Sequence, residues 1–155
     1  MVKPTRDLAL VSSLIDDLEI ISESEYGVVG YSKEHDLMYH EWLESSLEID
    51  DDVFRSECLH LFKILEEYRP TLFLVNDKKR KTSISEETQE FLVVNFQPLY
   101  AHPKMRKVAL VSNEELSIQG QAESTMEDID KNTSSNTAEF TFFIDVAQAV
   151  KWFGI

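Results

Sequence analysis

The chain has 155 residues, of which 29 are acidic and 15 are basic, so its formal net charge is −14 at pH 7. A chain of this length is long enough to bury a substantial core, and we expect a single domain over residues 1–155. The negative charge disfavours nucleic acid as a partner, because phosphate binding needs a strong basic field. It also disfavours adsorption to an anionic membrane surface.

The short apolar runs and the single cysteine of the chain bear on its cellular location. The longest wholly apolar runs, such as residues 8–11 and 91–94, are far shorter than the roughly 20 residues that span a bilayer. We therefore expect no integral membrane association. Cys58 is the one cysteine and cannot form an internal disulfide, which favours a cytoplasmic location. Its helical spacing from Leu61 and Leu65 favours a packing role over a reactive thiol.

The first third of the chain predicts an antiparallel meander. Residues 18–22, 28–31 and 37–43 are short apolar or β-branched runs separated by polar turns. Residues 1–17 form an extension of uncertain structure, whose apolar positions fit either a strand or a short helix.

A helix follows over residues 53–68, where apolar side chains recur at helical spacing. The aspartates at positions 50–52 precede it and can cap its free N–H groups. Arg69-Pro70 ends it, because the residue before proline avoids the helical region.

The second half alternates strands with helices and predicts a mostly parallel sheet with right-handed crossovers. Its strands are expected over residues 71–76, 106–112 and 139–144, and its helices over residues 84–102, 114–129 and after Asp145. Pro98 should kink or end the helix that contains it. Residues 130–138 are polar and rich in turn formers, which indicates a surface loop.

A family resemblance covers about residues 18–155 and rests on element order and hydrophobic spacing. The segments that carry it are YHEWL (39–43), TLFLVND (71–77), SISEETQEFL (83–92), KVALVS (107–112) and EFTFFIDVAQAVKWF (139–153). They resemble the SpoIIAA-like (STAS/SEC14-type) small domains. The resemblance implies an α/β single domain with a mixed four- to five-stranded sheet, an antiparallel N-terminal meander and about four flanking helices.

The resemblance also implies a binding function for proteins or for small apolar and anionic ligands. Bacterial members are anti-sigma factor antagonists, switched by phosphorylation of a serine at the helix start after a central strand. Ser83 and Ser85 occupy about that place and are the phosphosites that the resemblance suggests. However, residues 76–85 lack the aspartate–serine–small–glycine turn of that switch. Either serine can instead be a helix N-cap, and Ser83 has capping-box spacing to Glu86.

The positive charge is concentrated in one part of the chain. Residues 1–77 carry −12 and residues 114–155 carry −6, whereas residues 78–113 carry +4. Four consecutive basic residues follow a predicted strand and precede a helix, at the sheet edge where open α/β sheets bind ligands. The predicted partner or ligand site comprises Asp77, Lys78, Lys79, Arg80, Lys81, Ser83 and Ser85. The alternative is a solvated basic turn that offsets the local acidic surplus.

The histidines do not form a catalytic pattern. On a strand over residues 37–43, His40 shares a face with Met38 and Trp42, while Tyr39 and Glu41 point the other way. His40 and Glu41 therefore cannot form a dyad. No nucleophile-elbow, metalloprotease, dinucleotide or P-loop motif is present. We expect no catalytic residues, no metal site and no cofactor.

Two functions are consistent with the sequence. The first is a non-enzymatic regulatory module that binds a protein partner or a small ligand, and the sequence leaves a homodimer open. The alternative is a carrier of a small apolar or lipid ligand in a cavity between sheet and helices. The aromatic side chains near the strands could line such a cavity, although core packing also explains them.

Overall fold

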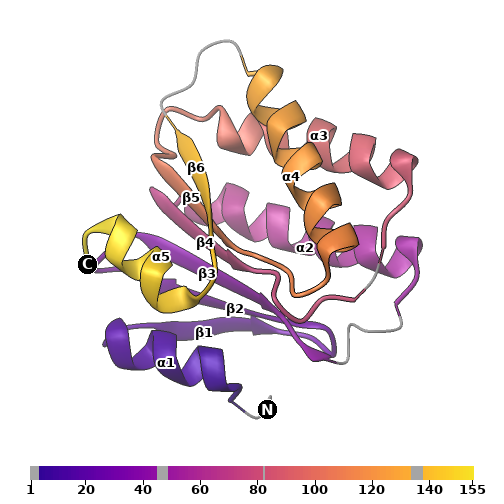
Figure 1. Cartoon of the computed structure of the whole chain (residues 1–155). Coiled ribbons are helices and arrows are strands. Elements are labelled where there is room, and N and C mark those ends of the chain that lie inside the picture. Colours follow the sequence, from indigo (N-terminus) through magenta and orange to yellow (C-terminus); the bar gives the residue numbers. More distant parts are fainter. Residues whose placement is uncertain (1–3, 45–48, 82, 134–137) are drawn as a thin grey trace.

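The computed structural model describes residues 4–44, 49–81, 83–133 and 138–155. Within these residues the chain forms one six-stranded mixed sheet and five helices (Figure 1). The strands lie across the sheet in chain order, from β1 at one edge to β6 at the other. The α/β class is as predicted. The sheet has six strands, as the element order along the chain indicates, and not the four or five that the resemblance implies.

The N-terminal strands form the predicted antiparallel meander. β1 (Glu19–Glu23) pairs with β2 (Gly27–Ser32), and β2 pairs with β3 (Leu37–Trp42). The sequence of the N-terminal extension fits either a strand or a helix, and the structure shows a helix there, α1 (Arg6–Leu14). Its N-cap Thr5 accepts a hydrogen bond from the Leu8 N–H. This helix is a fifth one, beyond the four expected.

The C-terminal strands extend the sheet in parallel. β4 (Leu72–Asn76) pairs with β3, β5 (Lys107–Val111) with β4, and β6 (Glu139–Phe143) with β5. Phe73 and Leu74 on β4 pack into cores on opposite faces, as expected for a strand buried on both sides. Among the described strands, β6 has a neighbour on one side only.

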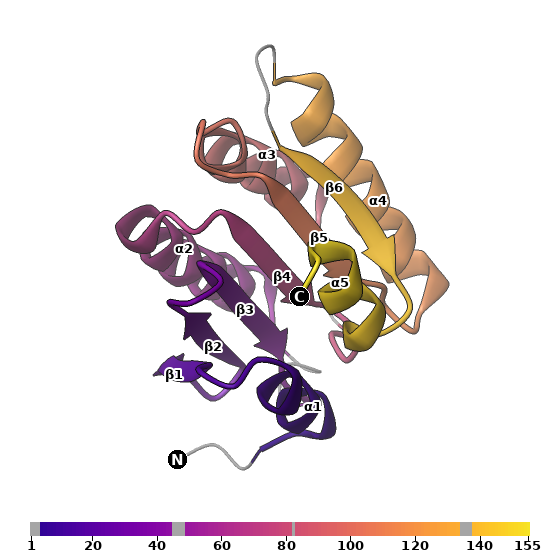
Figure 2. The ribbon, with the colours of Figure 1, turned by 90° about the vertical axis from the view of Figure 1, so that its left-hand side faces the viewer.

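Three crossover helices cover one face of the sheet, and the two outer helices of the chain cover the other (Figure 2). The crossover helices are α2 (Asp51–Tyr68), α3 (Glu86–Tyr100) and α4 (Leu116–Lys131). α5 (Val146–Phe153) packs against α1 on the opposite face. An apolar core lies under each helical layer, and a third apolar cluster includes Trp42 and Phe54.

The helix ends confirm several sequence expectations and correct others. Asp50 caps α2 as predicted, and Asp145, after which the last helix was expected, caps α5. α2 ends before Arg69, which adopts a left-handed conformation with φ of 47°. Of the two serines expected as an N-cap, Ser85 caps α3, so the capping-box spacing of Ser83 is not used.

Pro98 lies in the last turn of α3, and the helix ends two residues after it, at Tyr100. The predicted loop over 130–138 begins later than expected, because α4 extends through Lys131. Positions 134–137 of that loop lie outside the described residues.

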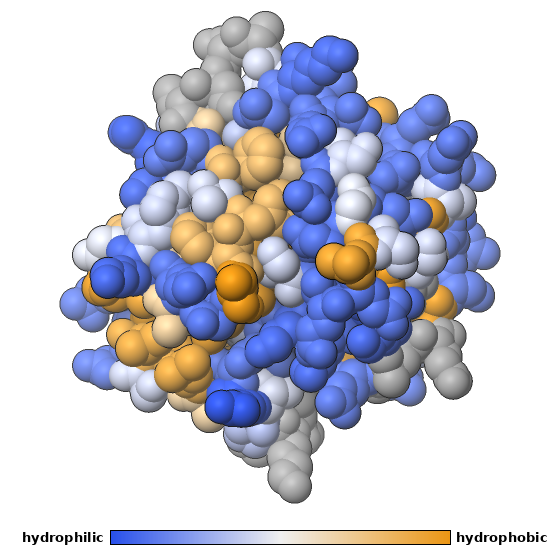
Figure 3. All heavy atoms as spheres, viewed as in Figure 1, coloured by the Kyte–Doolittle hydropathy of each residue, from blue (hydrophilic) through white to orange (hydrophobic). Residues whose placement is uncertain are grey.

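Most of the surface in Figure 3 is hydrophilic, with apolar side chains gathered over the edge strand β6. Phe140 and Phe142 on this strand are partly exposed, and Ile144 just after it is 76% exposed. Among the described residues, no helix has both the length and the apolar composition needed to cross a membrane.

Candidate functional site

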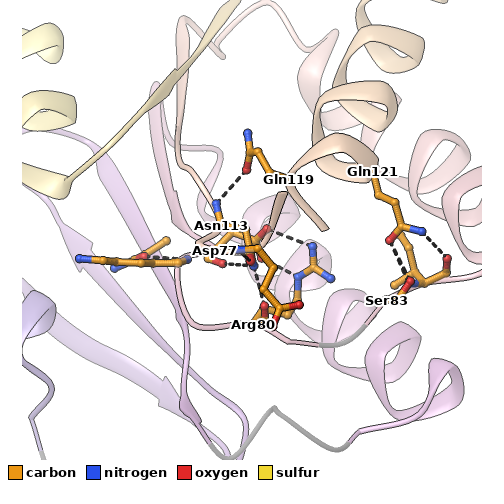
Figure 4. Close-up of polar contacts among 10 residues, drawn as sticks. Asp77, Arg80, Ser83, Asn113, Gln119 and Gln121 are labelled. Atoms are coloured by element: carbon orange, nitrogen blue, oxygen red, sulfur yellow. Dashed lines mark hydrogen bonds and ion pairs between the residues drawn. The ribbon is translucent and has the colours of Figure 1, made fainter. Parts of the chain in front are cut away.

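The basic loop after β4 turns one of its charges inward. Arg80 is 4% exposed and Asp77 is 7% exposed, and the Arg80 Nε donates to Asp77 Oδ1 at 2.5 Å. A second bond joins Arg80 Nη2 to Asp77 Oδ2 at 3.0 Å (Figure 4). The interpretation of four solvated basic side chains is thus wrong for Arg80, because it forms a buried ion pair with Asp77, the residue that follows β4.

An asparagine from the next crossover fixes this turn. The Asn113 side-chain amide donates to the backbone carbonyls of Asp77, at 2.7 Å, and of Arg80, at 2.5 Å. Gln119 in turn accepts a hydrogen bond from the Asn113 N–H at 2.8 Å (Figure 4). The Asp77–Arg80 turn is therefore held by the loops after both β4 and β5.

The other basic side chains of the loop are matched to acidic ones. Lys79 Nζ lies 2.7 Å from Glu114 Oε1, and Lys81 Nζ lies 3.5 Å from Glu115 Oε1. The bond to Lys79 lowers the pKa of Glu114. Lys78 is half-buried, and its N–H donates to the side chain of Asn76. This part of the predicted site is thus largely charge-compensated within the molecule.

The two serines of the predicted site play different structural roles. Ser85 caps α3, and its hydroxyl also donates to Asp51 Oδ2 at 2.5 Å, which lowers the pKa of Asp51. Ser83 is exposed and lies 3.4 Å from the side-chain oxygen of Gln121 (Figure 4). The same glutamine oxygen accepts the N–H of Ile84 at 3.1 Å.

Behind this loop lies a cavity of about 130 Å³ between the sheet and helices α2, α3 and α4. Its wall is mainly apolar, with Met126 and Ile129 from α4 and Val108 from β5 among its members. Five aromatic rings also line it, namely Trp42, Phe54, Phe62, Phe73 and Phe96. Trp42 stacks on Phe54 with ring centroids 5.0 Å apart. The alternative sequence hypothesis places a cavity in this layer, and the structure has one there.

The few polar side chains of the cavity wall are satisfied, with one exception. Asp77 and Arg80 bond each other, and the Thr125 hydroxyl donates to the Gln121 carbonyl at 2.8 Å. His40 on β3 also lines the cavity and is 3% exposed. Its Nδ1 is the one buried side-chain nitrogen or oxygen among the described residues that has no hydrogen-bond partner. Buried polar atoms without a partner are rare in folded proteins.

The strand next to β3 makes room for this imidazole. A Cβ atom at Gly27 would lie 3.0 Å from His40 Nε2, so a larger residue there would crowd the ring. The ring also meets Trp42 edge to face, with centroids 5.1 Å apart. His40 is thus held by backbone on one side and by an aromatic ring on another.

Burial keeps the titratable groups of the cavity uncharged, apart from the ion pair. Desolvation lowers the pKa of His40 to about 3, so the imidazole is neutral at physiological pH. Burial also raises the pKa of the Cys58 thiol, which lines the same cavity. The packing role predicted for Cys58 is confirmed, since the side chain is 5% exposed in an apolar cluster.

A separate polar cluster lies on the opposite face of the sheet. The Tyr39 hydroxyl donates to Glu41 Oε1 at 2.5 Å, and Asn76 Nδ2 donates to the Tyr39 oxygen at 3.0 Å and to Asp7 Oδ2 at 2.8 Å. Burial raises the pKa of Glu41. The predicted separation of His40 and Glu41 onto opposite faces is therefore confirmed, and this cluster does not reach the cavity.

The sequence placed some of these residues and missed others. It put His40 on the same face as Met38 and Trp42 and linked Asp77 to Ser85 as one loop. It missed that Arg80 turns inward and that His40 faces a cavity. The available signal for His40 was one polar residue between two large apolar ones on the face of the strand that the helices cover.

Comparisons of the chain with protein-family models, with curated proteins and with solved structures found no match.

Proposed function

We propose that this protein is a non-enzymatic binding module that holds a small, mainly apolar ligand in the cavity between the sheet and helices α2, α3 and α4. The observation that carries the proposal is the cavity itself, with its aromatic and aliphatic wall. Ligand sites are typically concave, mostly apolar and equipped with a few polar groups. This cavity has that composition.

The size of the cavity limits the ligand. Apolar cavities of roughly 150 Å³ hold a molecule the size of benzene. At about 130 Å³, this cavity has room for a single-ring compound. We therefore propose a small aromatic molecule, rather than a lipid, as the ligand of the carrier hypothesis.

The loop predicted as the partner surface contributes to the cavity wall. Asp77, Arg80 and Ile84 line the cavity, whereas Lys79 and Lys81 pair with glutamates outside it. A ligand in the cavity would therefore contact the inner side of a loop whose outer side faces solvent. This arrangement supports a regulatory role, in which a ligand in the cavity alters the outer surface of the loop and thereby the binding of a protein partner.

Binding is favoured over catalysis by the state of the polar groups. A neutral His40 of low basicity and an un-ionised Cys58 are poor acids, bases or nucleophiles.

We also propose the SpoIIAA-like membership that the sequence resemblance suggests. A mixed sheet with an antiparallel meander and helices on both faces supports it.

The proposal is tested by titrating toluene into the purified chain. The sequence has two tryptophans, so in a Trp152→Phe background the fluorescence reports only Trp42, which lines the cavity. We expect saturable quenching or enhancement, together with a rise in melting temperature, because a ligand that binds only the folded state stabilises it.

A matched pair of variants locates the site. Ala122→Leu adds a larger side chain at the cavity wall, whereas Ala147→Leu makes the same change on the exposed side of α5. Ala122→Leu should weaken toluene binding at least roughly tenfold, since it removes the space that the ring needs. Ala147→Leu should leave binding unchanged. Absence of toluene binding to the parent protein, or equal effects of the two variants, would contradict the proposal.

A further inference from the structure

We propose that the ligand of this cavity is a small aromatic alcohol or phenol whose hydroxyl group hydrogen-bonds to Nδ1 of His40. This inference rests on the proposed function and specifies its ligand chemistry. Two independent observations meet at one place, namely an aromatic cavity and a buried nitrogen of its wall without a partner.

The wall selects for an aromatic ring. Rings from β3, β4, α2 and α3 surround the space, and Trp42 and Phe54 are already stacked with an interplanar angle of 11°. Flat ligands gain favourable edge and face contacts from such a wall. The volume of about 130 Å³ is close to that of an apolar cavity that holds a single benzene-sized ring.

The polar atoms select for a single hydroxyl group. Asp77, Arg80 and Thr125 already bond other protein groups, so they present little unmet hydrogen-bonding capacity to the cavity. His40 Nδ1 has no partner. A neutral imidazole nitrogen either donates or accepts, depending on its tautomer, and a hydroxyl can serve as partner in both cases. A methyl group in the same position would leave the nitrogen unsatisfied.

A charged ligand is disfavoured by the same surroundings. A free carboxylate or phosphate in the cavity would be taken out of water without a counter-charge of its own, because the Arg80 guanidinium is already bonded to Asp77. The neutral His40, whose charged form is suppressed by burial, cannot supply that charge either. The inferred ligand is therefore neutral.

Phenol and toluene form the decisive pair of probes, because they have the same ring and differ only in the hydroxyl or methyl group. Both are titrated into the Trp152→Phe protein and into its His40→Phe derivative, with Trp42 fluorescence as the readout. We expect the preference for phenol over toluene to fall by roughly tenfold in His40→Phe, while toluene binding persists. His40→Asn, whose amide can reach the place of Nδ1, should keep part of the preference.

A measurement on the unsubstituted protein reports the contact directly, and the His40→Phe variant is needed only to assign the signal. The chain has four histidines, and the imidazole ¹⁵N signal that is missing from the His40→Phe spectrum belongs to His40. Phenol should shift the His40 Nδ1 resonance, and toluene should shift it much less.

The outcomes separate this inference from the proposed function. If toluene and phenol both bind with a selectivity that His40→Phe leaves unchanged, the hydroxyl inference is overturned and the cavity function stands. If neither probe binds, both are overturned. A selectivity that depends on His40, with the matching ¹⁵N shift, supports both.

Discussion

At the scale of single residues, His40 couples the stability of the fold to pH. In the folded protein its pKa is about 3, against 6.5 in the unfolded chain. Between these values the unfolded chain binds the extra proton, so the free energy of unfolding decreases as the pH falls through this range. The full stability is present above about pH 6.5 and is progressively lost toward pH 3.

We therefore predict that acid destabilises the wild-type protein more than a His40→Phe variant. Between about pH 7.5 and pH 5, the wild type should lose about 2 kcal/mol more, because its buried histidine must become charged only on unfolding. Urea denaturation at a series of pH values measures the difference. Met38→Leu, a change on the same strand and face without a titratable group, should lower stability equally at every pH. Parallel pH curves for wild type and His40→Phe would exclude this coupling.

Residue-scale features were also the hardest to obtain from the sequence. That His40 lies on the helix-covered face follows from strand alternation, but its missing partner depends on how three helices pack over that face. Arg80 lies in a run of four basic residues, and such a run predicts a solvated loop. Its burial depends on Asp77 three positions earlier and on Asn113 from another crossover, which holds the turn.

At the scale of the elements, the start of α3 is stabilised by one serine side chain and not by the basic side chains that precede it. The Ser85 hydroxyl accepts the Thr88 N–H at 3.2 Å and donates to Asp51 at the start of α2. It thus caps one helix and links it to another. Ser83, two residues earlier, makes only an exposed contact at 3.4 Å.

This difference predicts unequal effects of two matched substitutions. Ser85→Ala should lower the free energy of unfolding by about 1 kcal/mol, because an N–H group at the helix start loses its acceptor. Ser83→Ala should change it by less than about 0.5 kcal/mol, as surface substitutions usually do. Chemical denaturation of the two variants provides the comparison. A larger loss in Ser83→Ala would show that the helix start has been assigned to the wrong serine.

Elements with strong local patterns were predictable, and those with weak ones were not. The apolar stripe of α2 and the dense apolar runs of β4 and β5 are local properties of the chain. The extension before β1 matched both strand and helix periodicities, and only packing against α5 distinguishes them. The number of strands taken from the family resemblance was wrong, whereas the order of elements read along the chain includes all six strands.

At the scale of the whole molecule, the net charge of −14 should make folding sensitive to ionic strength. Three of the four basic side chains of the loop are paired with Asp77, Glu114 and Glu115, so the remaining surface is dominated by unbalanced carboxylates. Repulsion among like charges destabilises a compact state, and salt screens it.

We predict that the melting temperature rises as sodium chloride increases from about 10 mM to about 150 mM, over which the screening length falls from about 30 Å to about 8 Å. The double variant Glu123→Gln/Glu127→Gln removes two exposed negative charges from α4 and should show a weaker dependence. Differential scanning calorimetry at several salt concentrations tests both statements. A melting temperature that falls with added salt would mean that attractive ion pairs outweigh the repulsion.

The order of strands across the sheet has a consequence for synthesis of the protein. Because each strand neighbours its predecessor in the chain, pairing can follow the chain as it leaves the ribosome. The face beneath α1 and α5 is different, since Val146, Ala149 and Val150 complete it only after all six strands exist. Until then, the apolar side chains of β4 and β5 on that face remain open to water. A nascent chain that stalls after β6 would thus expose an apolar sheet surface, which α5 covers when it packs against β5 and α1.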